Sequence, residues 1–141
     1  MRRHRRIALD TSAIIYQLEA NPKYVALTHT VFLWIEQLNH LAFTSAITMT
    51  EVLVPGYREN NREKIDRFFG CLTTYPNLQW VAADLGVADA AAQIRAKFNL
   101  RTPDAIQAAT ALRSGATGFV TNDPAFLRVE GIETAVLDRF L

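Results

Sequence analysis

Short apolar runs alternate along the whole chain with longer stretches of helical periodicity. The short runs, each bounded by polar or turn-forming residues, cover residues 7–9, 41–45, 78–81, 118–121 and 134–137. Between them, apolar residues recur every three or four positions, as on the buried face of a helix. Strands that alternate with helices need crossover connections, which build a mainly parallel sheet covered on both faces. The sequence therefore predicts an α/β fold with its functional side chains beyond the carboxyl ends of the strands.

The helical periodicity also predicts where the individual helices lie. Asp84 and Asn61 are side chains typical of helix starts, whereas Pro55 should break or kink its helix. Leu38 and Cys71 are expected to face the core. The helices are predicted over residues 11–18, 24–38, 47–57, 60–75, 84–99 and 102–114.

The chain is most simply a single domain over residues 1–141, of which 50% are hydrophobic. That length is enough to bury a sizeable core. Residues 1–6 form a basic segment with four arginines and one histidine that leads into the first strand. Such a segment either contacts phosphates or is a solvated tail. The net charge of +1 gives no general attraction to nucleic acid.

Composition excludes several classes of protein. The single cysteine, Cys71, rules out an intramolecular disulfide framework and cysteine-rich zinc motifs. Without a signal-peptide pattern or an apolar run of about 20 residues, we expect a cytoplasmic protein that does not contact the membrane. The three histidines show no metal-ligand spacing, and no glycine-rich phosphate loop is present.

Four carboxylates occupy positions near the carboxyl ends of the strands, where functional side chains of a parallel sheet are expected. Asp10 ends the first strand, and Glu51 lies on the helix that follows the second. Asp104 falls in the first turn of a helix for which Thr102 is the expected N-cap, and Asp123 follows the fourth strand. Taken singly, each acid could serve as a helix cap or complement a helix dipole, and Glu51 could close a capping box with Thr48.

Together, the four acids predict a metal site. Carboxylates gathered at one edge of a sheet repel one another unless they are protonated or bind a cation. Oxygen donors without histidine or cysteine favour Mg²⁺ or Mn²⁺, which can activate water and neutralise charge on a phosphodiester. Polar neighbours could orient the carboxylates or water, or could simply cap helices and form turns. These neighbours are Thr11, Ser12, Thr121 and Asn122.

The acidic segments resemble, in order, the four acidic motifs of PIN-domain ribonucleases. The matching stretches are Leu9-Asp-Thr-Ser-Ala13, Thr50-Glu51, Thr102-Pro-Asp-Ala-Ile106 and Thr121-Asn-Asp123. The likeness covers nearly the whole chain and is greatest to VapC-type toxins of toxin–antitoxin pairs. It implies a three-layer α/β/α sandwich with a central, mainly parallel sheet of short strands.

The same resemblance implies the function of these acids. Asp10, Glu51, Asp104 and Asp123 would be the catalytic, Mg²⁺- or Mn²⁺-binding residues of an endoribonuclease, and Thr121 would support them. Members of the family are usually homodimers, and in toxin pairs an antitoxin segment blocks the active site. Many relatives carry a further acid just after the last motif, but Pro124-Ala125-Phe126 supplies none. We therefore expect one firmly bound ion.

Two other functions remain open on the sequence alone. A PIN fold could serve mainly as an RNA- or protein-binding module with little catalysis, although the complete acidic set favours an enzyme. An aspartate-based phosphatase could use Asp10 as a nucleophile. Such phosphatases normally carry a second acid two residues later, where this chain has Ser12.

Overall fold

The computed structural model describes residues 3–141. Its centre is a parallel sheet of five strands in the order β3-β2-β1-β4-β5. The strands are β1 (Arg6–Leu9), β2 (Leu41–Ser45), β3 (Leu78–Val81), β4 (Gly118–Thr121) and β5 (Glu133–Val136). The chain starts in the middle of the sheet, builds outward to β3, and then crosses back to add β4 and β5 on the other side of β1.

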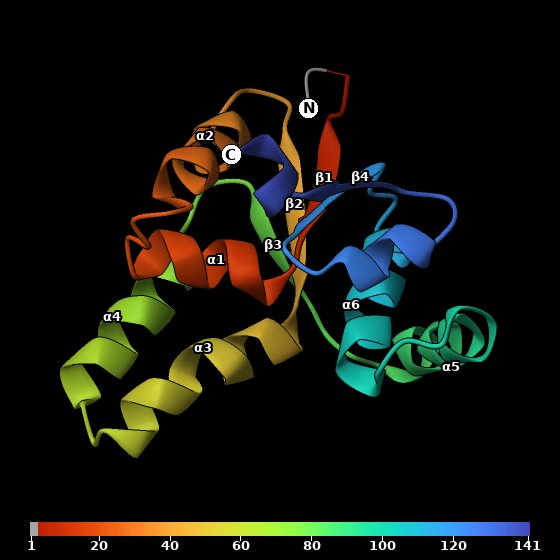
Figure 1. Ribbon diagram of the computed structural model, residues 1–141. Helices are drawn as coiled ribbons and strands as arrows, with labels where there is room; N and C mark the ends of the chain where they lie inside the picture. Colours follow the sequence, from red (N-terminus) through yellow and green to blue (C-terminus); the bar gives the residue numbers. More distant parts are fainter. Residues whose placement is uncertain (1–2) are drawn as a thin grey trace.

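Six helices cover the sheet on both faces. They are α1 (Thr11–Leu18), α2 (Val25–Ile35), α3 (Ala46–Arg58), α4 (Arg62–Thr73), α5 (Leu85–Phe98) and α6 (Thr102–Arg113). Two short 3₁₀ helices, η1 (Pro124–Arg128) and η2 (Leu137–Phe140), flank β5. The first four helices lie on one side of the sheet and α5 and α6 on the other (Figure 1). The three-layer α/β/α sandwich expected from the sequence is confirmed.

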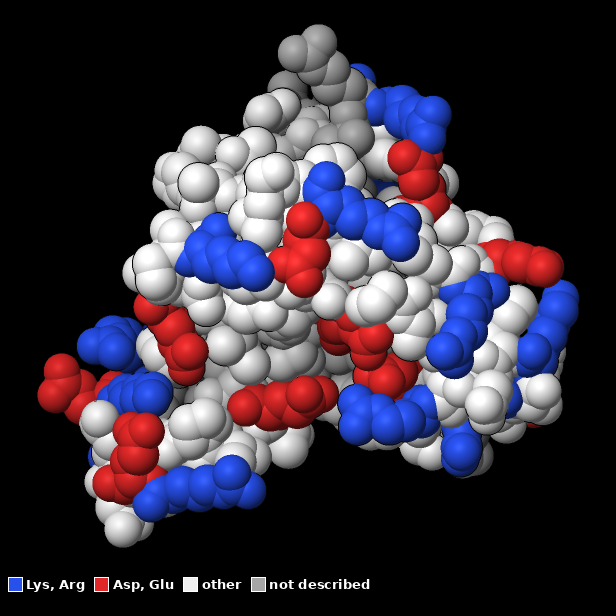
Figure 2. Space-filling model, in the orientation of Figure 1, with Lys and Arg blue, Asp and Glu red and all other residues white. Residues whose placement is uncertain are grey.

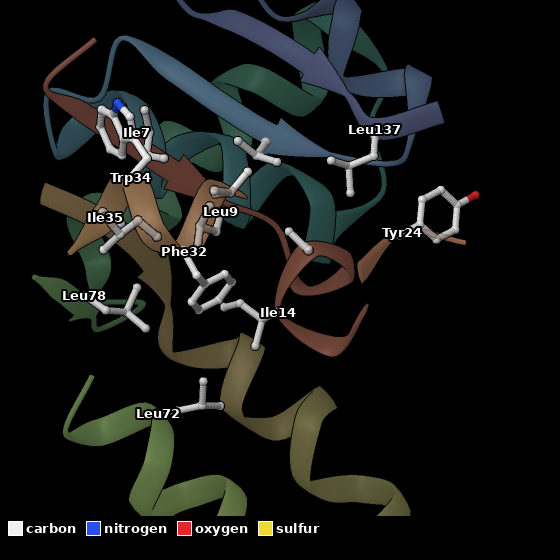
Figure 3. Packing of buried hydrophobic residues seen from close by; sticks show 14 of the residues in the cluster. Ile7, Leu9, Ile14, Tyr24, Phe32, Trp34, Ile35, Leu72, Leu78 and Leu137 are labelled. Carbon is white, nitrogen blue, oxygen red and sulfur yellow. The ribbon is translucent and has the colours of Figure 1, made fainter. Parts of the chain in front are cut away.

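Alternating residues of the central strands fill two separate cores. Ile7 and Leu9 of β1 point into the core under α1–α4, whereas Ala8 between them belongs to the core under α5 and α6. In the first core, Ile14 of α1, Phe32 of α2 and Leu72 of α4 converge on the strand side chains (Figure 3). A strand buried on both faces reads as a continuous apolar run, which is why β1 was recognisable in the sequence.

The second core depends on small side chains in α6. Ala105, Ala108, Ala109 and Ala111 are all buried, with at most 2% of their surface exposed. They let α6 approach the sheet closely, and α6 also packs on α5. The approach matters for function because it fixes the start of α6 beside the end of β1.

Three local expectations were wrong. Pro55 does not break its helix, which continues to Arg58, because the ring removes only one backbone donor. Leu38 is 87% exposed because α2 ends at Ile35. Cys71 is exposed on the outer side of α4.

The basic segment at the start of the chain is partly docked on the domain. Arg6 donates to the carbonyl oxygen of Ser114 over 2.7 Å, and Arg5 Nη1 donates to His40 Nε2 over 2.9 Å. Arg3 forms an ion pair with Glu133. Arg3, Arg5 and Arg6 are therefore not part of a free tail, while Arg2 lies outside the described residues. Across residues 3–141, no helix has both the length and the apolar character needed to cross a membrane.

Two helical glycines predict opposite effects of adding a methyl group. A Cβ at Gly56 would lie 2.7 Å from Ile65 Cγ1, whereas a Cβ at Gly70 would meet nothing within 4 Å. Gly56→Ala should lower the free energy of unfolding by about 1–3 kcal/mol through overpacking. Gly70→Ala should raise it by about 0.5–1 kcal/mol, because alanine is the better helix former. Urea denaturation of the two variants checks the contrast, and equal effects of the same sign would contradict it.

Candidate active site

The acidic residues meet where the strand order reverses. The chain leaves β1 toward β2 and leaves β4 toward β5, so the crevice beyond the ends of β1 and β4 is the switch point at which parallel sheets bind ligands. Asp10 follows β1, and its backbone N–H donates to the carbonyl oxygen of Val120 on β4 over 2.9 Å. Asp123 follows β4. The topology alone thus places these two acids side by side.

An open pocket of ≈ 730 Å³ contains all four predicted acids. Asp10 and Asp123 come from the strand ends, Glu51 from α3 and Asp104 from α6. Figure 2 shows acidic side chains gathered around a hollow in this face of the molecule. The remaining lining residues are Thr11, Ser12, Ile15, Tyr16, Ile47, Thr50, Arg101, Thr102, Pro103 and Ile106.

Asp10 is partly buried and is held by two hydrogen bonds. Its Oδ1 accepts from the backbone N–H of Thr11 over 2.8 Å, which caps α1, and its Oδ2 accepts from the Thr121 hydroxyl over 2.8 Å. Burial raises the pKa of Asp10 to about 6, the two hydrogen bonds oppose the rise, and the charges of Asp104 and Glu51 add to it. Asp104 exerts the larger of these two charge effects.

Asp104 lies in the first turn of α6, where the helix dipole favours a negative charge. Only 15% of its side chain is exposed, and its Oδ2 accepts from Arg101 Nε over 3.2 Å. The expected cap was wrong in detail: Arg101 is the N-cap, it makes no side-chain cap bond, and Thr102 is already helical. Because 80% of the Arg101 side chain is exposed, its guanidinium forms a basic edge of the pocket.

Glu51 and Asp123 complete the acidic lining from opposite sides. Glu51 is exposed on α3, and the suggested capping box with Thr48 was wrong, because Ser45 caps this helix. Asp123 Oδ1 accepts from the backbone N–H of Ala125 over 2.9 Å. The Thr121 hydroxyl donates to Asp10 and accepts from the Asp123 N–H over 3.1 Å, so one side chain joins the two strand-end acids.

Ser12 and Asn122 join the start of α1 to the loop that follows β4. The Asn122 backbone N–H donates to Ser12 Oγ over 3.2 Å, and its side-chain amide donates to the Tyr16 hydroxyl over 3.2 Å. The Asn122 Oδ1 accepts from the backbone N–H of Asp138 over 2.9 Å. These two residues therefore brace the pocket wall.

Three buried polar residues beneath the pocket were missed by the sequence analysis. Gln107 Nε2 donates to Thr48 Oγ1 over 2.7 Å and to Thr11 Oγ1 over 3.3 Å. Thr44 lies on the other side of Thr48, with the two hydroxyl oxygens 2.9 Å apart. The available signal was a glutamine within the alanine-rich inner face of α6, and a threonine on the inner side of α3.

The pocket fits a hydrated divalent ion rather than a closed cage. Its donors are carboxylate and hydroxyl oxygens, the set that Mg²⁺ and Mn²⁺ prefer. Across residues 3–141, however, no three His, Cys, Asp or Glu side chains converge tightly enough to hold an ion by themselves. Mg²⁺ commonly uses one or two carboxylates and keeps several waters. Asp104 exerts a larger charge effect on the pKa of Asp10 than Glu51 does, and this pair of carboxylates fits that role.

A second pocket of similar size has a different character. It occupies ≈ 690 Å³ between α2 and the C-terminal segment and is mostly apolar. Its lining contains no aspartate or glutamate. The acidic pocket is therefore the one equipped for chemistry with a cation.

Comparison with known families agrees with this arrangement. Residues 7–132 match the PIN domain family. The match spans both strand-end acids as well as Glu51 and Asp104, and the chain belongs to the PIN-domain family. Among curated proteins, no sequence match is found.

Solved structures share the fold at low sequence identity. VapBC-1 from nontypeable Haemophilus influenzae is 20% identical, with a TM-score of 0.71 over 94% of this chain and 98% of that chain. VapBC2 from Rickettsia felis, bound to a fragment of promoter DNA, is 15% identical, with a TM-score of 0.70 over 92% and 97%. VapC20 from Mycobacterium tuberculosis, described as a sarcin–ricin loop cleaving toxin, is 14% identical, with a TM-score of 0.62 over 80% and 86%.

Proposed function

We propose that this chain is a Mg²⁺- or Mn²⁺-dependent endoribonuclease and the toxin of a toxin–antitoxin pair. The observation that carries the proposal is the placement of four carboxylates from four elements in one pocket at the switch point of a PIN-domain sheet. The similar structures include a toxin named for cleaving the sarcin–ricin loop and several toxin–antitoxin complexes. Those names support a ribonuclease toxin as the proposed function.

The residues of the pocket would have different roles in phosphodiester hydrolysis. Asp10 and Asp104 would hold the ion, with Glu51 and Asp123 acting through water. When bound, such an ion lowers the pKa of a coordinated water and neutralises charge on the phosphate. The Thr121 hydroxyl keeps Asp10 Oδ2 oriented over 2.8 Å. This hydrogen bond would hold the Asp10 carboxylate in the orientation needed to bind the ion.

Arg101 is the basic residue best placed to contact the RNA backbone. Its exposed guanidinium lines the pocket, whereas Arg95 donates to Leu100 O and Thr102 Oγ1, and Lys97 pairs with Glu130. An arginine can bind a phosphate through two parallel hydrogen bonds. An ion held by Asp104 would compete with Arg101 for that carboxylate, which would leave the guanidinium to contact the substrate.

Metal dependence is the direct test of the proposed activity. The purified chain should cleave total RNA in Mn²⁺ and lose that cleavage in excess EDTA. Its Tm should also rise with Mn²⁺ concentration, because an ion that binds only the folded state stabilises it. Cleavage that is unaffected by EDTA would contradict the metal role. Mn²⁺ stabilisation without cleavage of any RNA would instead favour a binding module.

The proposed partners are an antitoxin and a second copy of the chain. Several similar structures are VapBC or toxin–antitoxin complexes by name, which supports a protein partner. The family resemblance implies that a segment of this partner lies across the acidic pocket. Co-expression with an adjacent reading frame tests the first partner: the two proteins should co-purify, and the complex should be inactive on RNA. Light scattering of the purified chain tests the homodimer.

A further inference from the structure

We propose that Thr48 and Gln107 are positioning residues for the acidic pocket. With Thr11 and Thr44 they form a buried network that sets the spacing of the carboxylates and hence the affinity for a divalent ion. This inference rests on the proposed metal-dependent function. It assigns a role to residues that do not themselves line the pocket.

The network is compact and entirely enclosed. Thr11, Thr44, Thr48 and Gln107 are 4%, 1%, 0% and 2% exposed. Thr48 is its centre: its hydroxyl oxygen lies 2.7 Å from Gln107 Nε2, 2.9 Å from Thr44 Oγ1 and 3.2 Å from Thr11 Oγ1. The Thr44 hydroxyl also donates to the carbonyl oxygen of Leu9 over 3.0 Å, at the end of β1. Five elements, β1, β2, α1, α3 and α6, therefore meet in one set of hydrogen bonds.

Three members of the network stand next to acids of the pocket. Thr11 directly follows Asp10. Thr48 precedes Glu51 by three residues on α3, and Gln107 follows Asp104 by three residues on α6. Residues three apart on a helix lie on the same side, one turn from each other. A shift of Thr48 or Gln107 would therefore be passed through less than one turn of helix to a carboxylate.

Stability alone does not explain why polar groups occupy these positions. A buried amide or hydroxyl costs free energy unless it is hydrogen bonded, and apolar side chains of similar volume can pack equally well there. The neighbouring residues of α6 are buried alanines. Hydrogen bonds add directionality, which apolar packing lacks. They hold the starts of α1 and α6 at a fixed separation, and that separation would set how well the carboxylates of the pocket bind an ion.

The test uses a pair of substitutions at the centre of the network. Thr48→Val keeps the shape but removes the hydroxyl, and Thr48→Ser keeps the hydroxyl. Thr48→Val should weaken Mn²⁺ binding, measured by calorimetry, by at least about tenfold, the effect typical of groups that orient metal ligands. Thr48→Ser should stay within about twofold of the wild type. Equal Mn²⁺ affinity in the two variants would overturn the proposal.

A buried threonine remote from the pocket supplies the matched control. Thr28 is 0% exposed, and its hydroxyl donates to Gln17 Oε1 over 2.8 Å. Thr28→Val should lower the Tm as Thr48→Val does, but leave Mn²⁺ affinity unchanged. If Thr48→Val does not fold, Gln107→Met removes the two donated bonds while keeping an unbranched side chain. It should show the same loss of affinity, and wild-type affinity in Gln107→Met would overturn the proposal.

A measurement without metal separates this inference from the proposed function. In EDTA, hydrogen exchange at the first turns of α1 and α6 should be faster in Thr48→Val than in Thr48→Ser or Thr28→Val. Unchanged exchange overturns the positioning role whether or not the wild type binds Mn²⁺. If the wild type neither binds Mn²⁺ nor cleaves RNA, the proposed function is refuted. If hydrogen exchange in the variants still differs in this way, the network still positions the starts of α1 and α6.

Discussion

Asp104→Asn is expected to reduce RNA cleavage by more than about a hundredfold while leaving the fold intact. The amide has nearly the volume of the carboxylate but removes the negative charge that would hold the ion beside Asp10. Groups that only orient metal ligands cost roughly 10–100-fold when removed, so loss of a direct ligand should exceed that range. Initial rates on a short fluorescent RNA at saturating Mn²⁺ would measure the loss.

Asp66→Asn is the matched control for this substitution. Asp66 Oδ1 lies 3.2 Å from Arg62 Nε on the same helix, as Asp104 Oδ2 lies 3.2 Å from Arg101 Nε. Both changes remove a carboxylate paired with an arginine one turn away, but Asp66 is on α4, outside the pocket. Asp66→Asn should keep wild-type activity. A folded Asp104→Asn protein that also cleaves at the wild-type rate would remove Asp104 from the active site.

The architecture was predictable because its signals are local. Each strand is a short apolar run bounded by turn residues, and β2, β3 and β4 have the expected bounds. Asn61 and Asp84 cap α4 and α5 with their own side chains, and Asn99 ends α5 in the left-handed conformation. Parallel pairing then follows from the alternation of strands and helices. The acidic pocket follows in turn from the carboxyl ends of the strands.

Where prediction from sequence failed, the deciding contact lies far away in the chain. Thr48 and Glu51 match a capping box locally, yet Thr48 is buried because its partners are Thr11, 37 residues earlier, and Gln107, 59 residues later. Leu38 fits the periodicity of α2, but the helix stops before reaching it. Helical periodicity predicts on which face of a helix a residue lies, but it does not predict which other elements cover that face.

The distances between the carboxylates could not be predicted from the sequence either. Order along the strands places Asp10 and Asp123 at one edge, but the approach of Asp104 depends on how closely the alanines of α6 let it pack. The structure brings the four acids into one pocket without closing any three of the described His, Cys, Asp and Glu side chains around an ion. Incomplete closure is what a hydrated ion that also binds substrate oxygens requires.

Asp10→Asn should make the metal-free protein more stable at neutral pH, even though it would remove one acid of the proposed catalytic site. Burial raises the pKa of Asp10 from 3.8 to about 6 in the folded protein. Between these values the folded state holds a proton that the unfolded chain has released. The free energy of unfolding therefore falls as the pH rises from about 4 to about 6, and the loss is complete above that range. A difference of about two pKa units corresponds to about 3 kcal/mol.

The asparagine removes this cost but keeps only part of the hydrogen bonding to Thr11 and Thr121, so we expect a net gain of about 2 kcal/mol, or about 4–8 °C in Tm, at pH 7.5. In EDTA the Tm advantage of Asp10→Asn should shrink as the pH falls toward 4, because the carboxyl of the folded wild type is then protonated and the carboxyl of the unfolded chain is approaching its own pKa of 3.8. Saturating Mn²⁺ at pH 7.5 should reduce or reverse the advantage, because only the wild type gains the full binding energy. Thermal unfolding of the two proteins across this pH range checks both trends. A Tm difference that does not vary with pH would mean that folding does not raise the pKa of Asp10.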